Sequence, residues 1–257
     1  MWLLAKADVD PDDMNGSSYY AYQAKARGLR NNSDVDGLVR EMVPVYRRLL
    51  GDWLPDHRRA SVYEVACGPG IFLRYLMAEG YVSVSGSDSS ECQIGLARQA
   101  GLNVFLGDSI QELARMGAGS VDCVVGIDFI EHLPKDVLIL FFEQAFRVLA
   151  PGGVLILRAP NGDSPFVGRN LFNDITHYWA YTSVATRALL QMVGFGSVDF
   201  HDDSEAMLQR HRWFKVPAMR MSRLILRLLI RMAVREDVAF LGPNLFVYAR
   251  KAGLSDA

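Results

Sequence analysis

A turn that contains one carboxylate and two glycines is the first part of this chain whose residue types suggest chemistry. In the stretch YEVACGPGIF, Glu64 stands four residues before Gly68, and Gly70 follows two residues later. A hydrophobic run precedes the turn and a helical pattern follows it. Backbone N–H groups and the positive end of the helix dipole would therefore face a ligand. The turn predicts a binding site for a nucleotide or a nucleoside.

Two phosphate-binding interpretations of this turn fit poorly. A P-loop needs the pattern GxxxxGK followed by Ser or Thr, and the turn contains no Lys. A dinucleotide fingerprint, G-x-G-x-x-G, needs a third glycine where Leu73 stands, and a bulky side chain there would keep the helix away from the strand. A nicotinamide-dependent oxidoreductase remains the alternative from another enzyme class.

Three carboxylates suit a nucleoside that carries an ammonium group rather than phosphates. Glu64, inside the turn, would attract a cation. Asp88 ends the second hydrophobic run, 20 residues after Gly68, where an acidic side chain can accept both ribose hydroxyls. Asp108 follows the third run and can accept from an exocyclic amine such as adenine N6.

A histidine in a polar and aromatic stretch could act as a general base. The segment DITHYW contains Asp174 and His177, and Tyr178, Trp179 and Tyr181 are close by. A His side chain with a pKa of about 6.5 can remove a proton from a hydroxyl. The same His could equally be structural, bonding its loop to the edge of the sheet. Exposed aromatic side chains here would form a stacking platform for a sugar.

A second cluster consists of Asp128, Glu131 and His132. The spacing i, i+3, i+4 puts the three side chains on one side of a helical turn, a geometry that could hold a divalent cation. Against that stands a simpler interpretation, in which the Glu and His line a pocket or cap the following helix. We favour this interpretation, and expect no metal.

The elements that must position these residues follow from the alternation of short apolar runs with helical patterns. Strands are expected at 61–66, 82–88, 103–108, 120–128 and 154–160, with helices at 71–80, 89–101, 109–117 and 134–153 between them. Strict alternation with apolar strands means a parallel sheet covered on both faces. The fold class is therefore α/β, a single doubly wound, Rossmann-like domain. In such sheets ligands bind beyond the carboxyl ends of the strands.

The remaining segments complete a mostly parallel sheet of seven strands. A helix and a strand are expected at 184–200 and a last strand at 243–251, which leaves a helical insertion at about 202–242. A helix at 36–55, closed by Pro55, precedes the sheet. Residues 1–60 would form an N-terminal arm and a helical lid, and residues 61–257 the ligand-binding domain.

Taken together, these motifs resemble those of the class I S-adenosylmethionine-dependent methyltransferases. EVACGPG resembles the family's first motif, with Ala66 where a glycine is more usual. GSDSS resembles the ribose-binding position, GDS the adenine-binding position and VVGIDFIEHL the fourth motif. The resemblance covers about residues 61–160. It implies S-adenosylmethionine as the cofactor, bound by Glu64, Ala66, Cys67, Gly68, Gly70, Asp88, Ser89, Asp108, Ser109 and Ile127.

The resemblance also carries expectations about the reaction. THYWAYTSVATRALLQMVGF resembles methyltransferases whose loop holds H-x-x-x-[FY]-T before a helix that ends in Gly-Phe. This implies O-methylation of a small-molecule hydroxyl, a sugar or glycan precursor first, with His177 and Asp128 as catalytic residues. Nitrogen or carbon acceptors and a quinone-type phenol stay open, as does a non-catalytic scaffold. The residues expected to contact the substrate are Tyr22, His132, Asn161, Asp174 and Tyr178.

The pattern around Asp128 further resembles the acidic-x-x-Glu-His pattern of the ubiquinone-pathway O-methyltransferases, in which these residues bind magnesium. Asp128 stands where that family has Glu, and many relatives carry the Glu-His pair without a metal. Magnesium is therefore possible but not the favoured expectation.

Charge and composition limit the partners. The net charge of −2 argues against nucleic acid. Three cysteines without a CxxC pair indicate reduced thiols and a cytoplasmic protein. The stretch 219–235 carries five arginines on an apolar helical pattern, and could contact a membrane surface or an anionic substrate. We favour instead a helix packed on its own domain or on a dimer partner; the chain could be a monomer or a homodimer.

Overall fold

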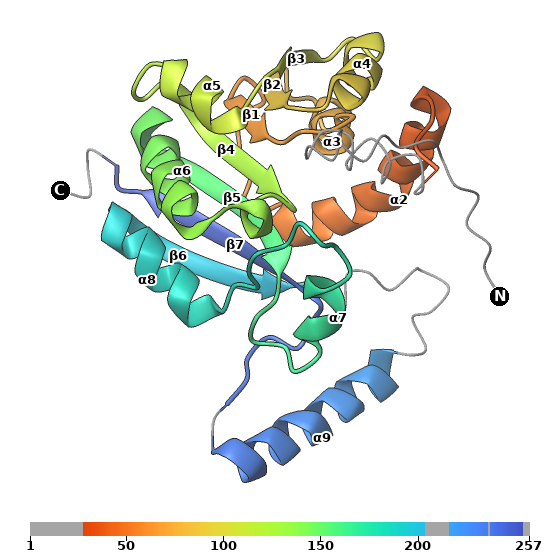
Figure 1. The fold of residues 1–257 in the computed structure, drawn as a ribbon, viewed down its shortest axis with the longest axis vertical. Helices are drawn as coiled ribbons and strands as arrows, with labels where there is room; N and C mark the ends of the chain where they lie inside the picture. The colour runs from red at the N-terminus through yellow and green to blue at the C-terminus, as the bar shows by residue number, and fades with distance from the viewer. Residues whose placement is uncertain (1–27, 204–215, 236, 254–257) are drawn as a thin grey trace.

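A seven-stranded sheet forms the centre of the molecule (Figure 1). The computed structural model describes residues 28–203, 216–235 and 237–253. The strands run in the order β3-β2-β1-β4-β5-β7-β6, and β7 is antiparallel to both of its neighbours. The mostly parallel, doubly wound sheet expected from the sequence is confirmed. The strands are β1 (Ser61–Val65), β2 (Ser83–Asp88), β3 (Asn103–Leu106), β4 (Val121–Ile127), β5 (Leu149–Pro160), β6 (Phe195–Asp202) and β7 (Asn244–Lys251).

Helices cover both faces of this sheet. One face packs on α2 (Asn32–Leu50), α3 (Ile71–Ala78) and α4 (Glu91–Gln99). The other packs on α5 (Ser109–Arg115), α6 (Lys135–Val148) and α8 (Ser183–Val193). Side chains of β5 alternate between the two cores, because successive residues of a strand point to opposite faces. The sheet is therefore buried on both sides, as its apolar runs require.

The helix α2 begins and ends earlier than the sequence suggested. Asn31 and Asp34 form a capping box that satisfies the first backbone N–H groups, so the helix begins at Asn32 rather than at residue 36. It ends at Leu50, and Pro44 lies inside it, which makes Pro55 wrong as its terminator. Arg74 of α3 donates to Asp36 (2.7 Å) and to Asn32 (2.6 Å). These bonds fix α2 beside the glycine turn.

Three further elements lie after β4. A short 3-10 helix, η2 (Ile130–His132), follows β4 directly, and α7 (Val167–Leu171) lies within the long connection after β5. The expected insertion between β6 and β7 contains α9 (Val216–Val234), which extends away from the sheet at the bottom of Figure 1. In the part of the chain that the structure describes, no helix is long and apolar enough to cross a membrane.

Candidate functional site

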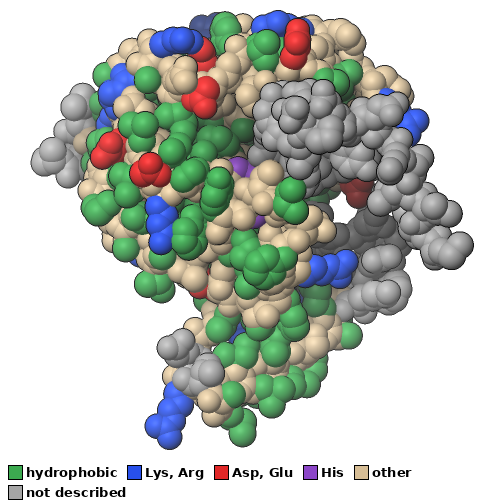
Figure 2. Space-filling view, in the orientation of Figure 1, with side chains coloured by type: hydrophobic (Ala, Val, Ile, Leu, Met, Phe, Trp, Pro, Cys, Tyr) green, Lys and Arg blue, Asp and Glu red, His purple; other side chains and the backbone are tan. Residues whose placement is uncertain are grey.

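A cavity of about 700 Å³ lies beyond the carboxyl ends of β1, β2, β4 and β5. Figure 2 shows histidine side chains at a hollow on this face. The cavity is of the size that ligand sites usually have, about 300–1,000 Å³. It brings together most of the residues that the sequence singled out, namely Glu64, Ala66, Cys67, Gly68, Asp88, Ser89, Asp108, Ile127, Asp128, Glu131, His132, Asp174 and His177.

The glycine turn is shaped by left-handed backbone. Gly68 has a φ of 52° and Gly70 a φ of 79°. A side chain on Gly70 would be strained at this φ, and its Cβ would lie 2.1 Å from Leu102 Cδ1, so Leu102 would have to move. The N–H of Ala66 donates to Ser109 Oγ at 3.0 Å. Gly70 and Ser109, expected to bind the cofactor, do not line the cavity and instead support the turn behind it.

Asp88 connects this turn to the end of β2. Its Oδ2 accepts from the Gly68 N–H at 2.9 Å, and its Oδ1 accepts from the Ser90 N–H at 2.8 Å. The side chain is buried but lines the cavity. Burial raises the pKa of this carboxyl, and the two backbone bonds oppose that rise. Each oxygen can accept a second bond, so the carboxylate can hold a pair of ligand hydroxyls.

Glu64 is a buried carboxylate at the end of β1. Glu64 is 3% exposed, and its Oε2 has no hydrogen-bond partner among the described residues. Burial, and second the charge of Asp88, raise the pKa of Glu64 well above its usual value. A buried acceptor of this kind is costly unless a ligand satisfies it. A cationic or N–H-donating ligand in the cavity would supply the missing partner.

Asp108 and Ser89 lie at the open rim of the same cavity. Both residues are exposed and both line it. Asp108 also caps α5, since its Oδ1 accepts from Ile110 N–H at 3.0 Å and from Gln111 N–H at 2.9 Å. One carboxylate oxygen of Asp108 thus serves the helix, and the other can face a ligand.

Two histidines stand side by side at the other end of the cavity. The rings of His132 and His177 are 4.7 Å apart between centroids. His177 Nδ1 lies 3.1 Å from the Leu171 carbonyl oxygen, which can only accept, so Nδ1 carries the proton. In the neutral ring the lone pair is then on Nε2, the atom that a base needs.

The tautomer of His132 is fixed by a chain of two hydrogen bonds. The Thr176 hydroxyl donates to Asp174 Oδ1 at 2.7 Å. Thr176 Oγ1 therefore accepts from His132 Nδ1, at 2.8 Å. Burial, and second the neighbouring His177, lower the pKa of His132. The neutral ring with its lone pair on Nε2 is the stable form.

A buried carboxylate adjoins the two imidazoles. Glu131 is 1% exposed, its Oε2 has no hydrogen-bond partner among the described residues, and its Oε1 lies 4.0 Å from His177 Nε2. Ligand atoms of Glu131, His132 and His177 all lie within 4.8 Å of one another, a set that could hold a metal ion. Burial, and second the charge of Asp128, raise the pKa of Glu131 well above its usual value.

This set differs from the one that the spacing suggested. Asp128 has a left-handed φ of 53°, and its Oδ2 accepts from Arg158 Nη1 at 2.9 Å. The residues 130–132 form a short 3-10 helix that Asp128 does not join. Asp128 therefore pairs with Arg158, and His177 takes its place beside Glu131 and His132.

Arg158 and Thr176 are site residues that the sequence reasoning missed. Arg158 lines the cavity, and its guanidinium is always charged. The signal was a single charge inside the apolar run VLILRAP, where a buried strand would exclude one without a partner. Thr176 gave no such signal, because its role depends on a loop that folds back onto η2.

Several residues expected to contact the substrate lie elsewhere. Asn161 is buried and donates from Nδ2 to the carbonyl oxygens of Phe240 (3.0 Å) and Gly242 (2.8 Å), outside the cavity lining. Tyr178 is exposed outside the lining, and Tyr181 is buried with its hydroxyl on the Ile130 carbonyl (2.8 Å). Because Tyr181 is buried, Tyr178, Trp179 and Tyr181 do not form one exposed platform. Tyr22 lies outside the described residues.

Comparisons with known proteins agree with this geometry. A family model of the methyltransferase domain matches residues 37–199. A ubiquinone biosynthesis O-methyltransferase of Erwinia tasmaniensis is 25% identical over 177 residues, 65% of each chain. A probable S-adenosylmethionine-dependent methyltransferase of Mycolicibacterium smegmatis is 33% identical over 155 residues, 59% of this chain and 56% of that protein. The chain thus spans between 56% and 65% of the length of these relatives.

Solved structures share the fold. A SAM-dependent methyltransferase from Archaeoglobus fulgidus has a TM-score of 0.63 at 20% identity, covering 91% of this chain and 99% of that one. Phosphoethanolamine N-methyltransferase 2 of Haemonchus contortus, in complex with phosphomonomethylethanolamine and S-adenosylhomocysteine, has a TM-score of 0.61 at 12% identity, covering 95% and 61%. The family model matches more than half of the 257 residues, so the chain belongs to the class I S-adenosylmethionine-dependent methyltransferases.

Proposed function

We propose that this enzyme methylates an oxygen atom, the hydroxyl of a small molecule. The observation that carries the proposal is that one cavity holds both the buried carboxylates of the glycine turn and two imidazoles whose Nδ1 atoms are already bonded. S-adenosylmethionine supplies a methyl group on a sulfonium sulfur. Everything else that the reaction needs, namely alignment and proton removal, has to come from the side chains that line the cavity.

The cofactor-binding end fits the polar groups of S-adenosylmethionine. Glu64 has an unpartnered buried oxygen, which suits the ammonium of the methionine part. Asp88 presents two oxygens that suit the ribose hydroxyls, and Asp108 is assigned to the adenine amine. No phosphate-binding group is needed, which agrees with the carboxylate inside the turn.

We assign the role of general base to His177. Its Nε2 accepts the hydroxyl proton as the new oxygen–carbon bond forms and the carbon–sulfur bond breaks, which neutralises the sulfonium. The Leu171 carbonyl holds the ring in the required tautomer. His132, held by Thr176 and Asp174, is assigned to orient the acceptor hydroxyl. Asp128 is assigned to hold the Arg158 guanidinium at the cavity wall through their ion pair.

A hydroxyl on an aromatic ring is the acceptor class that the site supports best. Several relatives of this chain are named ubiquinone biosynthesis O-methyltransferases, which supports oxygen as the acceptor atom. The wall of the cavity on the side of α2 and α3 is apolar, formed by Leu38, Met42, Ile71 and Phe72. Tyr181, one of the three aromatic residues that would have favoured a sugar, is buried. A sugar or glycan precursor is therefore the second candidate, before nitrogen and carbon acceptors.

The test is transfer of a labelled methyl group from S-adenosylmethionine to a panel of acceptors. The panel contains catechols and hydroquinones, free sugars, and aromatic amines of matched size. Methylation of the phenols that falls with His177→Ala supports the proposal. Turnover restricted to the amines would refute oxygen as the acceptor atom. Phenol turnover that His177→Ala leaves unchanged would refute His177 as the base.

A further inference from the structure

The outward side of α9 is apolar although it faces solvent. Six large side chains of this helix are between 51% and 80% exposed: Met221, Leu224, Ile225, Leu228, Leu229 and Met232. Figure 2 shows hydrophobic side chains gathered over the lower part of the molecule, where α9 lies in Figure 1. Exposed apolar patches of this extent mark interaction sites.

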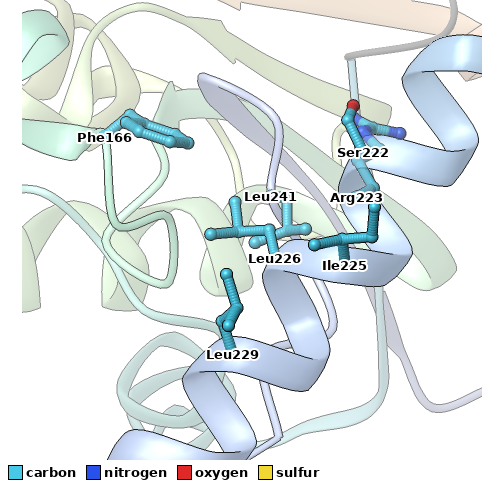
Figure 3. Close-up of a pocket in the computed structure, with 7 residues that line it drawn as sticks. All are labelled: Phe166, Ser222, Arg223, Ile225, Leu226, Leu229 and Leu241. Carbon is cyan, nitrogen blue, oxygen red and sulfur yellow. The ribbon is translucent and has the colours of Figure 1, made fainter.

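The inner side of α9 is already used for attachment to the domain. Arg223 lies 3.7 Å from Asp202, at the end of β6, and Arg227 donates to the Ala239 carbonyl. The half-buried Leu226 lines a groove of about 410 Å³ with Phe166 and Leu241, and Ile225 and Leu229 of the exposed set line the same groove (Figure 3). Met221, Leu224, Leu228 and Met232 are exposed and lie outside this groove, so most of the exposed apolar face takes no part in the attachment.

Positive charge runs along one flank of this apolar face. Arg220, Arg227 and Arg231 are seven and four residues apart, a spacing that puts them on the same side of the helix. The stretch 216–234 contains no acidic residue. The nearby Asp237 lies 3.7 Å from Arg231, and both side chains are well exposed. The flank thus places cations next to apolar side chains, and one of them, Arg227, also holds the helix through the Ala239 carbonyl.

We propose that α9 docks on the surface of an anionic lipid bilayer. The helix would lie in the interface plane with its apolar face at the acyl boundary, while the arginines reach the lipid phosphates. Charge complementarity selects this occupant over a second copy of the chain. Two copies joined antiparallel through the same face would bring their rows of arginines together, and the stretch 216–234 contains no carboxylate to pair with them.

Flotation of the full-length protein with lipid vesicles tests the proposal, and its outcome does not depend on methyl transfer. Two vesicle types are compared, phosphatidylcholine alone and phosphatidylcholine mixed with phosphatidylglycerol. The protein should float with the anionic vesicles, stay behind with the neutral ones, and be released by high salt. Binding of S-adenosylhomocysteine, measured on the same samples, reports separately on the proposed function.

Variants on the exposed face locate the contact without disturbing the core. Leu228→Gln should lower the partition into anionic vesicles about tenfold or more, because an apolar side chain is lost from the acyl boundary. Arg231→Gln should lower the same partition about fivefold, because one basic side chain near an anionic membrane surface contributes about 1 kcal/mol of binding free energy. Val184→Gln on α8, at a position that is also apolar and exposed but belongs to another helix, is the control and should change nothing.

Three results of the flotation experiment would overturn the proposal. They are absence of binding to anionic vesicles, equal binding to neutral vesicles, and binding that Leu228→Gln and Arg231→Gln leave intact. Sedimentation velocity without lipid measures whether the protein forms a dimer. A dimer that Leu228→Gln dissociates would assign the face to a second copy instead.

Discussion

The carboxylate of Asp88 accepts a hydrogen bond from the backbone N–H of Gly68 at 2.9 Å, across 20 residues of sequence. The same carboxylate accepts from Ser90, so one side chain holds both the glycine turn and the start of α4. A cofactor that bonds Asp88 would therefore bind a site whose shape is already fixed, and would lose little entropy in ordering it.

Replacing Asp88 should weaken cofactor binding. Asp88→Ala removes the proposed ribose contacts and the bond to Gly68, and should cost about 1–3 kcal/mol of binding free energy for S-adenosylhomocysteine. Asp88→Asn retains an acceptor for one backbone N–H but loses the charge, so its loss of binding free energy should be smaller than that of Asp88→Ala. Calorimetric titration of the three proteins measures both. An unchanged affinity in Asp88→Ala would remove the ribose assignment.

Replacing Glu64 should stabilise the ligand-free protein and weaken cofactor binding. The folded-state pKa of Glu64 lies above its unfolded value, so folding favours the protonated form. The free energy of unfolding therefore falls as the pH rises above the ordinary Glu pKa, and Glu64→Gln should reduce that fall. Denaturant titrations between acidic and neutral pH measure it.

The exposed Glu143→Gln on α6 is the control, and should leave the pH dependence as it is in the parent protein. A ligand-free Glu64→Gln protein that is less stable than the parent at neutral pH would contradict the interpretation of this carboxylate as a binding group kept at a cost in stability.

Removal of the His177 imidazole should slow the chemical step. Loss of a general base typically lowers kcat about 10²-fold or more, while affinity for S-adenosylhomocysteine should stay the same. Steady-state kinetics with the best acceptor, and calorimetry on the same protein, separate the two effects. His57→Ala, at an exposed position outside the cavity, is the matched control. Near-normal turnover of His177→Ala would make His177 structural.

The hydroxyl of Thr176 should matter although it contributes no chemistry of its own. Thr176→Val keeps the shape but breaks the chain from Asp174 to His132, so the ring can change tautomer. We expect kcat to fall about tenfold, which corresponds to about 1.4 kcal/mol. Thr176→Ser should restore most of the activity. Loss of activity in both variants, with unchanged thermal stability, would exclude this positioning role.

Chelation of metals should leave turnover unchanged. Asp128 pairs with Arg158 instead of joining the cluster, which leaves one carboxylate and two imidazoles, whereas Mg²⁺ prefers several oxygen ligands. Dialysis against EDTA followed by assays with and without added Mg²⁺ or Zn²⁺ measures this. Activity that disappears on dialysis and returns with one ion would identify the cluster as a metal site. His177 would then be a metal ligand rather than the general base.

The parts of the fold that follow local rules could be predicted from the sequence. The strands β1 to β5 are apolar runs bounded by helical patterns, and the glycine turn lies between a strand and a helix. Both the sheet and the edge where the cavity lies could therefore be predicted. Glu64 and Asp88 were identifiable because each is a carboxylate at the carboxyl end of a buried strand.

The loop between β5 and α8 could not be predicted in the same way. It has no periodic pattern, and its contacts reach residues far away in sequence, as in the bonds of Asn161 to Phe240 and Gly242. Buried backbone groups in such a loop need side-chain partners, and this requirement placed Asn161 and Tyr181 inside rather than in the cavity. Aromatic residues in a polar stretch were therefore a poor guide to substrate contacts.

The measurement that tests the account most directly is calorimetric titration of the purified protein with S-adenosylhomocysteine, with NAD in a parallel experiment, after removal of any ligand carried over. The account predicts a dissociation constant on the order of micromolar for S-adenosylhomocysteine and no heat with NAD. Binding of NAD alone, or of neither compound, would contradict the assignment of the glycine turn and the methyl-transfer chemistry that rests on it.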